Sequence, residues 1–320
     1  MSEEHHTLAL STCCISDRYV EGQHLMEEVA SMGFEYVELS HGVRMSLVSG
    51  ILQSVEQGVI KVASLHNFCP LPPGVHYAAP NLYEPTSSDR SERDQWLNQT
   101  IKTLDFAARL GANVVVLHGG AFHPLLALPL RKLHYYRKRY TAEQLAMDPR
   151  YRAMVQKAKA WIFQKSRGAS ERLIDSLEKL LPYAQERGIK IGLENRDSPF
   201  ELPTESDFVS LMKHFESSNT YYYWHDTGHA QIKESMGFAH QLDQLQTLSP
   251  YLMGYHLKDA LPNGQENLPI GEGTLDFARI LKYAHVSPNP ILTIELAPGV
   301  SQEKILQSKK HVEQLLTHES

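Results

Sequence analysis

The sequence predicts an α/β protein in which eight parallel strands alternate with helices and close into a (β/α)8 barrel, the TIM barrel. A unit made of an amphipathic helix, a glycine and a short β-rich run ending in a polar residue recurs along the chain. Eight such runs can be counted, which is the number of strands in this barrel. No GxGxxG motif follows the first run, so the doubly wound open sheet is less favoured.

The repeating unit also defines where the strands begin. Gly33, Gly111 and Gly188 each follow a helical pattern, and glycine suits the left-handed conformation that ends a helix. The apolar runs after these glycines are typical of strands covered on both faces. The expected strands are 8–12, 36–40, 62–66, 114–118, 190–194, 221–226, 253–256 and 292–295.

Two segments interrupt the regular spacing of this single expected domain, 1–320. Residues 68–88 are rich in Pro, Tyr and Asn and predict a long loop after the third strand, whereas 119–170 predict a helical insertion after the fourth. The insertion carries five cations among tyrosines: Arg131, Lys132, Arg137, Lys138 and Arg139. Two interpretations stay open, a solvated helix or subunit contact, and a lid that meets an anionic substrate.

Composition narrows the class of protein. Hydrophobic residues make up 42% and charged residues 21%, as in soluble proteins with a sizeable core. The net charge of −6 disfavours nucleic acid as a partner. The three cysteines form neither a disulfide framework nor a CxxC pair, and no export signal or membrane-spanning apolar run is visible. We therefore expect a cytoplasmic protein without membrane association.

The polar residues that end the expected strands form a chemically coherent set. In a TIM barrel the carboxyl ends of all strands meet at one pocket. The residues at these ends are His66, His118, Glu194, Asp226, His256 and Glu295. Carboxylates and imidazoles of this kind bind divalent transition metals. The sequence therefore predicts a metal site at the mouth of the barrel.

Five short runs give the chain a resemblance to a known superfamily. They are GLEN (192–195), HDTGH (225–229), YHLKD (255–259), IGEG (270–273) and TIEL (293–296). In this order they resemble the apurinic-endonuclease/xylose-isomerase-like barrels, and the resemblance covers nearly the whole chain. It implies that Glu194, Asp226, His256 and Glu295 are metal ligands, with manganese, cobalt or zinc as the ion. Two Glu, one Asp and one His also leave coordination positions open for two substrate oxygens.

Other site residues follow from the same resemblance. His66 and His118 match histidines that bind an additional zinc in the endonucleases, so they are expected to hold a second metal or to bind substrate. His229 resembles the histidine that contacts substrate oxygens in the epimerases. The endonucleases carry an Asp-Arg-His triplet where this chain has Gln-Glu-Asn at 265–267, which removes two ligands of a third zinc.

The basic residues after two strand ends are further candidates. Arg196 and Lys258 follow Glu194 and His256, so they either bind substrate or form surface salt bridges. Glu272, in the IGEG run, either orders a loop or touches substrate.

The expected reaction is isomerisation or epimerisation of a small sugar or related polyhydroxy carbonyl compound. A base removes a proton next to the carbonyl, and a metal stabilises the enediolate. By resemblance, Glu194 and Glu295 serve as acid and base from opposite sides of the substrate. The alternatives are a polyol-ketone (inosose-type) dehydratase, an apurinic-site endonuclease and a non-catalytic sugar-binding barrel. The resemblance also suggests a homodimer.

Overall fold

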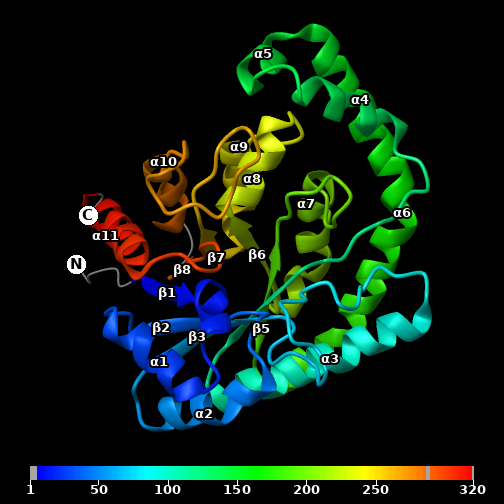
Figure 1. The fold of residues 1–320 in the computed structure, drawn as a ribbon. Coiled ribbons are helices and arrows are strands. Elements are labelled where there is room, and N and C mark those ends of the chain that lie inside the picture. Colours follow the sequence, from blue (N-terminus) through cyan, green and yellow to red (C-terminus); the bar gives the residue numbers. More distant parts are fainter. Residues whose placement is uncertain (1–5, 286–288, 319–320) are drawn as a thin grey trace.

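The computed structural model describes residues 6–285 and 289–318, which form a closed barrel of eight parallel strands in sequence order (Figure 1). Each strand pairs with the next, and β1 pairs with β8 to close the ring. The strands are β1 (Thr7–Ser11), β2 (Tyr36–Leu39), β3 (Lys61–His66), β4 (Val114–Leu117), β5 (Lys190–Glu194), β6 (Tyr221–Asp226), β7 (Leu252–Leu257) and β8 (Ile291–Ile294). The predicted TIM barrel is confirmed. The first and last residues of every expected strand differ by no more than one residue from those of an observed strand.

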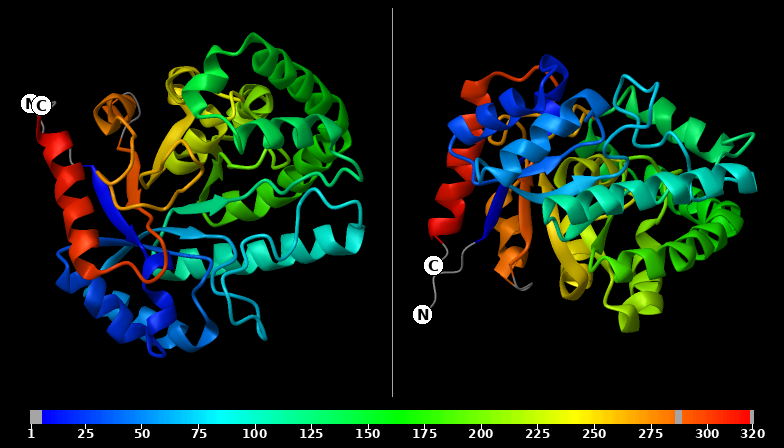
Figure 2. Two further views of the ribbon diagram at one scale, coloured as in Figure 1. Left: turned by 45° about the horizontal axis from the view of Figure 1, so that its top comes forward. Right: turned by 90° about the horizontal axis from the view of Figure 1, so that it is seen from below.

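Helices surround the barrel and follow the strands in turn. They are α1 (Gly22–Ser31), α2 (Val48–Glu56), α3 (Arg90–Leu110), α4 (Leu128–Arg137), α5 (Ala142–Met147), α6 (Pro149–Glu186), α7 (Glu205–Phe215), α8 (Thr227–Ser235), α9 (Gln241–Leu248), α10 (Phe277–Leu281) and α11 (Gln302–His318). Gly111 ends α3 in the left-handed region, with φ of 71°. Figure 2 shows α11 alongside β1, so the helical ring closes where the barrel closes. No helix within the described residues is long and apolar enough to cross a membrane.

The barrel interior is filled by one large aromatic side chain. Trp224 on β6 is fully buried among Ala9, Ala63 and other small or aliphatic residues of neighbouring strands. A Cβ added to Gly254 on β7 would lie 2.3 Å from the indole, and one added to Gly192 would lie 2.9 Å from it. Both strands therefore need glycine beside this ring. Because side chains two apart on a strand share a face, Trp224 places Asp226 on the inner side as well.

The segment after β4 is helical, as predicted, but its predicted end at residue 170 is wrong. Helices α4 and α5 lead into α6, which continues past 170 to Glu186, directly before β5. Its buried face includes Ala169, Leu173, Leu177 and Leu180, which keep helical spacing through the expected boundary. Nothing in this stretch stops the helix, so insertion and barrel helix are one element. In Figure 1, α4 and α5 form an arm at the far end of α6.

Candidate metal centre

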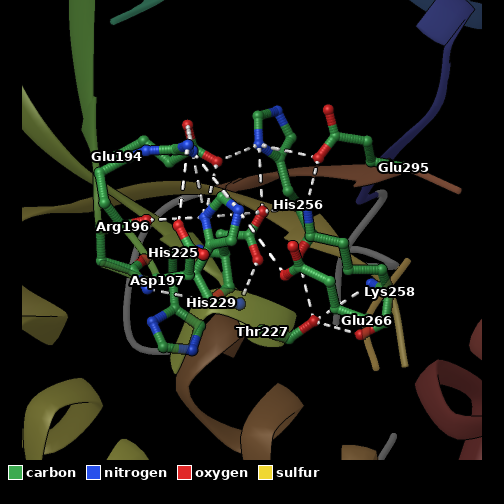
Figure 3. A network of polar contacts seen from close by, with 12 residues as sticks. Glu194, Arg196, Asp197, His225, Thr227, His229, His256, Lys258, Glu266 and Glu295 are labelled. Atoms are coloured by element: carbon green, nitrogen blue, oxygen red, sulfur yellow. Dashed lines mark hydrogen bonds and ion pairs between the residues drawn. The ribbon is translucent and has the colours of Figure 1, made fainter. Parts of the chain in front are cut away.

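Four of the predicted residues meet at the carboxyl ends of β5 to β8. Glu194 and Asp226 are the last residues of β5 and β6, His256 lies near the end of β7, and Glu295 follows β8. One donor atom from each lies within 4.8 Å of the other three. All four side chains are buried. Figure 3 shows Glu194 and Glu295 on either side of His256. Three carboxylates this close repel one another in a dry site, so the donor set fits a divalent cation.

The two carboxylate oxygens of Asp226 have different surroundings. Oδ1 accepts a hydrogen bond from the backbone N–H of His229 at 2.8 Å and so caps α8. Oδ2 is buried and accepts no hydrogen bond, although the Lys258 ammonium lies 2.7 Å away outside hydrogen-bonding geometry. Capping a helix therefore leaves one oxygen of Asp226 available to a cation.

His256 lies between carboxylates on both sides of its ring. Nδ1 is 2.9 Å from Glu194 Oε1, and Nε2 is 3.1 Å from both oxygens of Glu38. Burial opposes the charged imidazolium, but Glu295, Glu38 and Glu194 outweigh it and raise the pKa of His256 well above its usual range. The ring is therefore held by its partners at both nitrogens.

The two glutamates of the centre are held as carboxylates by neighbouring cations. Burial would raise the pKa of Glu194, but Arg196, His256 and hydrogen bonding from His118 hold it well below the usual range. The pKa of Glu295 is lowered as well, because Lys258 and His256 outweigh burial. Lys258 Nζ donates to Glu295 Oε2 at 2.7 Å. Both carboxylates are thus in the basic form that accepts a proton.

Arg196 and Lys258 lie inside the site, so the surface salt-bridge interpretation is wrong for both. Lys258 is 3% exposed. Arg196 Nη1 donates to Glu194 Oε2 at 3.2 Å, and its Nε donates to Glu201 at 3.1 Å. Each cation approaches the centre through a carboxylate rather than by pointing to solvent (Figure 3).

His66 and His118 form a second cluster that shares Glu194. His66 Nδ1 donates to the backbone carbonyl of Asn67 at 3.0 Å, and His118 Nδ1 lies 2.8 Å from Asn81 Oδ1. Their Nε2 atoms lie 3.4 and 2.9 Å from Glu194 Oε2. Because the carbonyl of Asn67 can only accept, Nδ1 of His66 is the donor to it, and Nε2 faces Glu194 inside the site.

His229 faces the same site from the first turn of α8. Its Nδ1 lies 3.0 Å from the backbone carbonyl of Asn195, and its Nε2 is 3.8 Å from Glu266 Oε2. Burial, together with Arg196 and Lys258, lowers the pKa of His229 well below its usual range. A neutral imidazole is therefore present beside the four carboxylate and imidazole donors.

Three residues of the site were missed from the sequence. Glu38 lies within β2, where a charged residue in a short apolar strand was the available signal. His41 follows β2, is in edge contact with His66, and has its pKa lowered to about 3, mainly by burial. Glu266 was noted only as a missing zinc ligand. Glu272, by contrast, is ion-paired with Lys304 on the outside.

A cavity of about 470 Å³ opens above the centre. Its inner wall includes His66, His118, Glu194, His229 and Glu295, and its outer wall includes 76–78 from the long loop after β3. That loop therefore lies on the predicted face. A cavity of this size accommodates a small polar molecule. Residues of the α4–α5 arm do not line it and instead line a separate cavity with Ser235 and 261–263.

Comparison with known proteins agrees with this architecture. Residues 26–311 match the family described as the xylose isomerase-like TIM barrel. The chain belongs to this family. The family resemblance inferred from the five sequence runs is therefore confirmed.

Solved structures share this fold at low sequence identity. A D-tagatose 3-epimerase-like protein superposes with a TM-score of 0.68, at 18% identity over 97% of both chains. An L-ribulose 3-epimerase superposes with a TM-score of 0.68, at 14% identity over 98% of this chain and 95% of that one. The probable L-ribulose-5-phosphate 3-epimerase UlaE of Mycoplasma pneumoniae is 27% identical over 143 residues, 44% of this chain and 45% of that enzyme. That match spans less than half of the relative.

Proposed function

We propose that this protein is a divalent-metal-dependent isomerase or epimerase of a small sugar or related polyhydroxy carbonyl compound. The observation that carries the proposal is the convergence of Glu194, Asp226, His256 and Glu295, whose donor atoms lie within 4.8 Å of one another beneath the cavity. Membership of the xylose isomerase-like family and the epimerase names among its relatives support it. The family resemblance implies manganese, cobalt or zinc as the ion, and carboxylate and imidazole donors are compatible with such divalent metals.

Glu194, Asp226, His256 and Glu295 would hold the metal. When bound, the ion supplies a Lewis acid that stabilises negative charge on two neighbouring substrate oxygens. Oδ2 of Asp226 accepts no hydrogen bond although it is buried and ion-paired with Lys258, so it can still bind a metal ion.

Glu194 and Glu295 carry the proton transfers in this proposal. One carboxylate removes the proton from the carbon next to the carbonyl, and the electron pair of that C–H bond forms the enediolate. In an epimerisation the second carboxylate, protonated from solvent, delivers its proton to the opposite face of the same carbon, and the first carboxylate releases the proton it removed to solvent. In an isomerisation the proton goes instead to the neighbouring carbon, and the hydroxyl proton of the first carbon is replaced by one taken up at the former carbonyl oxygen. Both pKa values are held low by Arg196, His256 and Lys258, so each group starts as a base.

His66 and His118 are assigned to substrate hydroxyl groups rather than to a second metal. Glu194 has two oxygens, of which Oε1 faces His256 and Oε2 faces the two histidines. A second ion would occupy Oε2 and leave no oxygen for proton transfer. It would also lie close to the guanidinium of Arg196, which is 3.2 Å from Oε2. A substrate hydroxyl, which can donate and accept, can instead form a hydrogen bond with the imidazole of His66.

The test is metal analysis of the purified protein, followed by solvent deuterium incorporation into a panel of ketoses, hydroxypyruvate and inososes. We expect one divalent ion per chain and deuterium exchange at the carbon next to the carbonyl, with no loss of water. A dehydrated product would favour the dehydratase. Two ions per chain with incision of abasic DNA would favour the endonuclease, and a protein that binds sugars without exchange would be a binding barrel.

A further inference from the structure

Glu38 is a buried carboxylate that the proposed reaction does not use. It lies on β2, is fully buried, and accepts a hydrogen bond from Ser64 Oγ at 2.8 Å. Both of its oxygens are 3.1 Å from Nε2 of His256. The opposite ring nitrogen, Nδ1, faces Glu194 at 2.9 Å, Glu295 at 3.7 Å and Asp226 at 3.8 Å. The imidazole therefore separates Glu38 from the rest of the centre.

The surroundings of Glu38 give it no other strong partner. Ser11 lies opposite Glu38 in the pairing of β1 with β2, and its hydroxyl makes no hydrogen bond. A buried carboxylate is costly unless it is paired, and an apolar side chain would fill the same space more cheaply. The contact with His256 accounts for the presence of a carboxylate at this level of the barrel.

We propose that Glu38 is a positioning residue that fixes the tautomer and orientation of His256 for metal binding. This inference rests on the proposed metal site. A carboxylate offers only acceptors, so it holds the ring hydrogen on Nε2 and leaves the Nδ1 lone pair directed at the cation position. Carboxylates behind metal-binding histidines also raise the basicity of the ligand.

The ring is restrained in its plane as well as at its nitrogens. The indole of Trp224 contacts it edge to face at 5.2 Å between centroids, and His66 stacks on it at 5.7 Å with an interplanar angle of 18°. Rotation of His256 about its side chain would break the bond to Glu38 and remove Nδ1 from Glu194. Glu38 therefore holds the ring in the orientation that directs Nδ1 towards Glu194.

Two substitutions at Glu38 and one elsewhere separate this role from a structural one. Glu38→Leu removes both acceptors, whereas Glu38→Gln keeps one acceptor oxygen and loses the charge. Glu205→Gln is the matched control, because Glu205 is a carboxylate paired with buried Lys233 at 2.5 Å and touches no residue of the metal site. Thermal unfolding of the metal-free variants measures what each change does to the fold.

The readout is the zinc dissociation constant, measured by competition with a chromophoric chelator. We expect Glu38→Leu to bind zinc about 10- to 100-fold more weakly, Glu38→Gln to lose less, and Glu205→Gln to be unchanged. NMR of 15N-histidine in the zinc-loaded wild type should show the hydrogen of His256 on Nε2, and Glu38→Leu should lose this signature. Because Glu38→Gln retains an acceptor and the shape of the side chain, it keeps the test open if Glu38→Leu fails to fold.

Three results would overturn the inference. A folded Glu38→Leu protein that binds zinc as tightly as the wild type would overturn the inference and leave the proposed metal site standing. A wild-type His256 that carries its hydrogen on Nδ1 would do the same. If Glu38→Leu does not fold, a Glu38→Gln variant with unchanged zinc affinity would overturn the inference. A wild-type chain without zinc affinity would remove the proposed metal site together with the role of Glu38.

Discussion

The two halves of the barrel contribute different chemistry to the same cavity. Strands β5 to β8 supply the four candidate metal ligands, three of which are carboxylates. Strands β1 to β4 and the loops after them supply His41, His66 and His118, and Glu38 beneath them. The pKa values of His41 and His118 are lowered, mainly by burial, so these rings are neutral. One half is thus suited to a cation and the other to uncharged hydroxyl groups.

The largest effect is expected from substitutions in the half of the barrel formed by β5 to β8, which supplies the carboxylates. Glu194→Gln and Glu295→Gln should each reduce solvent deuterium exchange by about 10²- to 10⁴-fold, because each removes a proton acceptor. NMR of the substrate in deuterated water measures the exchange, and circular dichroism checks the fold. Substantial exchange in either variant would show that this residue does not transfer the proton. The proposed difference between the two halves of the barrel would then be wrong.

An intermediate effect is expected from the histidine half. His118→Ala should raise KM for the substrate about tenfold, because a hydrogen bond to a substrate hydroxyl is lost, and should leave one metal ion bound per chain. Steady-state kinetics and metal analysis of the same preparation measure both. If the wild type bound two ions and His118→Ala one, the histidines would belong to a second metal site, and the contrast between the halves would disappear.

The smallest effect is expected outside both halves, on the α4–α5 arm. Arg137 lines the cavity beside 261–263, away from the candidate metal centre. Arg137→Ala should change kcat/KM for an unphosphorylated ketose by less than about twofold, because Arg137 does not line the cavity above the candidate metal centre. Parallel assays with a ketose and its phosphate ester measure the change. A loss confined to the ester would favour the lid that meets an anionic substrate.

The sequence anticipated much of the centre because its signals are local. Glu194 ends an apolar run after a glycine stop, and Glu295 ends an apolar run that follows Pro290, so both could be assigned to strand ends. Asp226 precedes an expected helix, and it does cap α8 while remaining in the site. Chemistry at strand ends could be predicted because a barrel directs all of these ends to one face.

Other features had no local signal. Lys258 is paired with carboxylates that follow or end other strands, whereas Arg196 is paired with Glu194, two residues before it. The depth of both cations in the site could not be predicted from their positions in the sequence. The uninterrupted α6 was divided at 170 because a long insertion was expected to stop before the barrel helix. The roles of Glu266 and His41 depend on neighbours that the chain does not place near them in sequence.

By itself, the sequence determined the eight strands, the glycines that end helices and the residue types at the barrel mouth, because hydrophobic periodicity and helix stops operate over a few residues. Only the tertiary structure decided which side chains share one level of the barrel. Glu38 and His256 are 218 positions apart and come from strands that do not pair, yet their side chains meet across the interior. Closure of the sheet and the stagger of its strands set that meeting, and no local pattern encodes them.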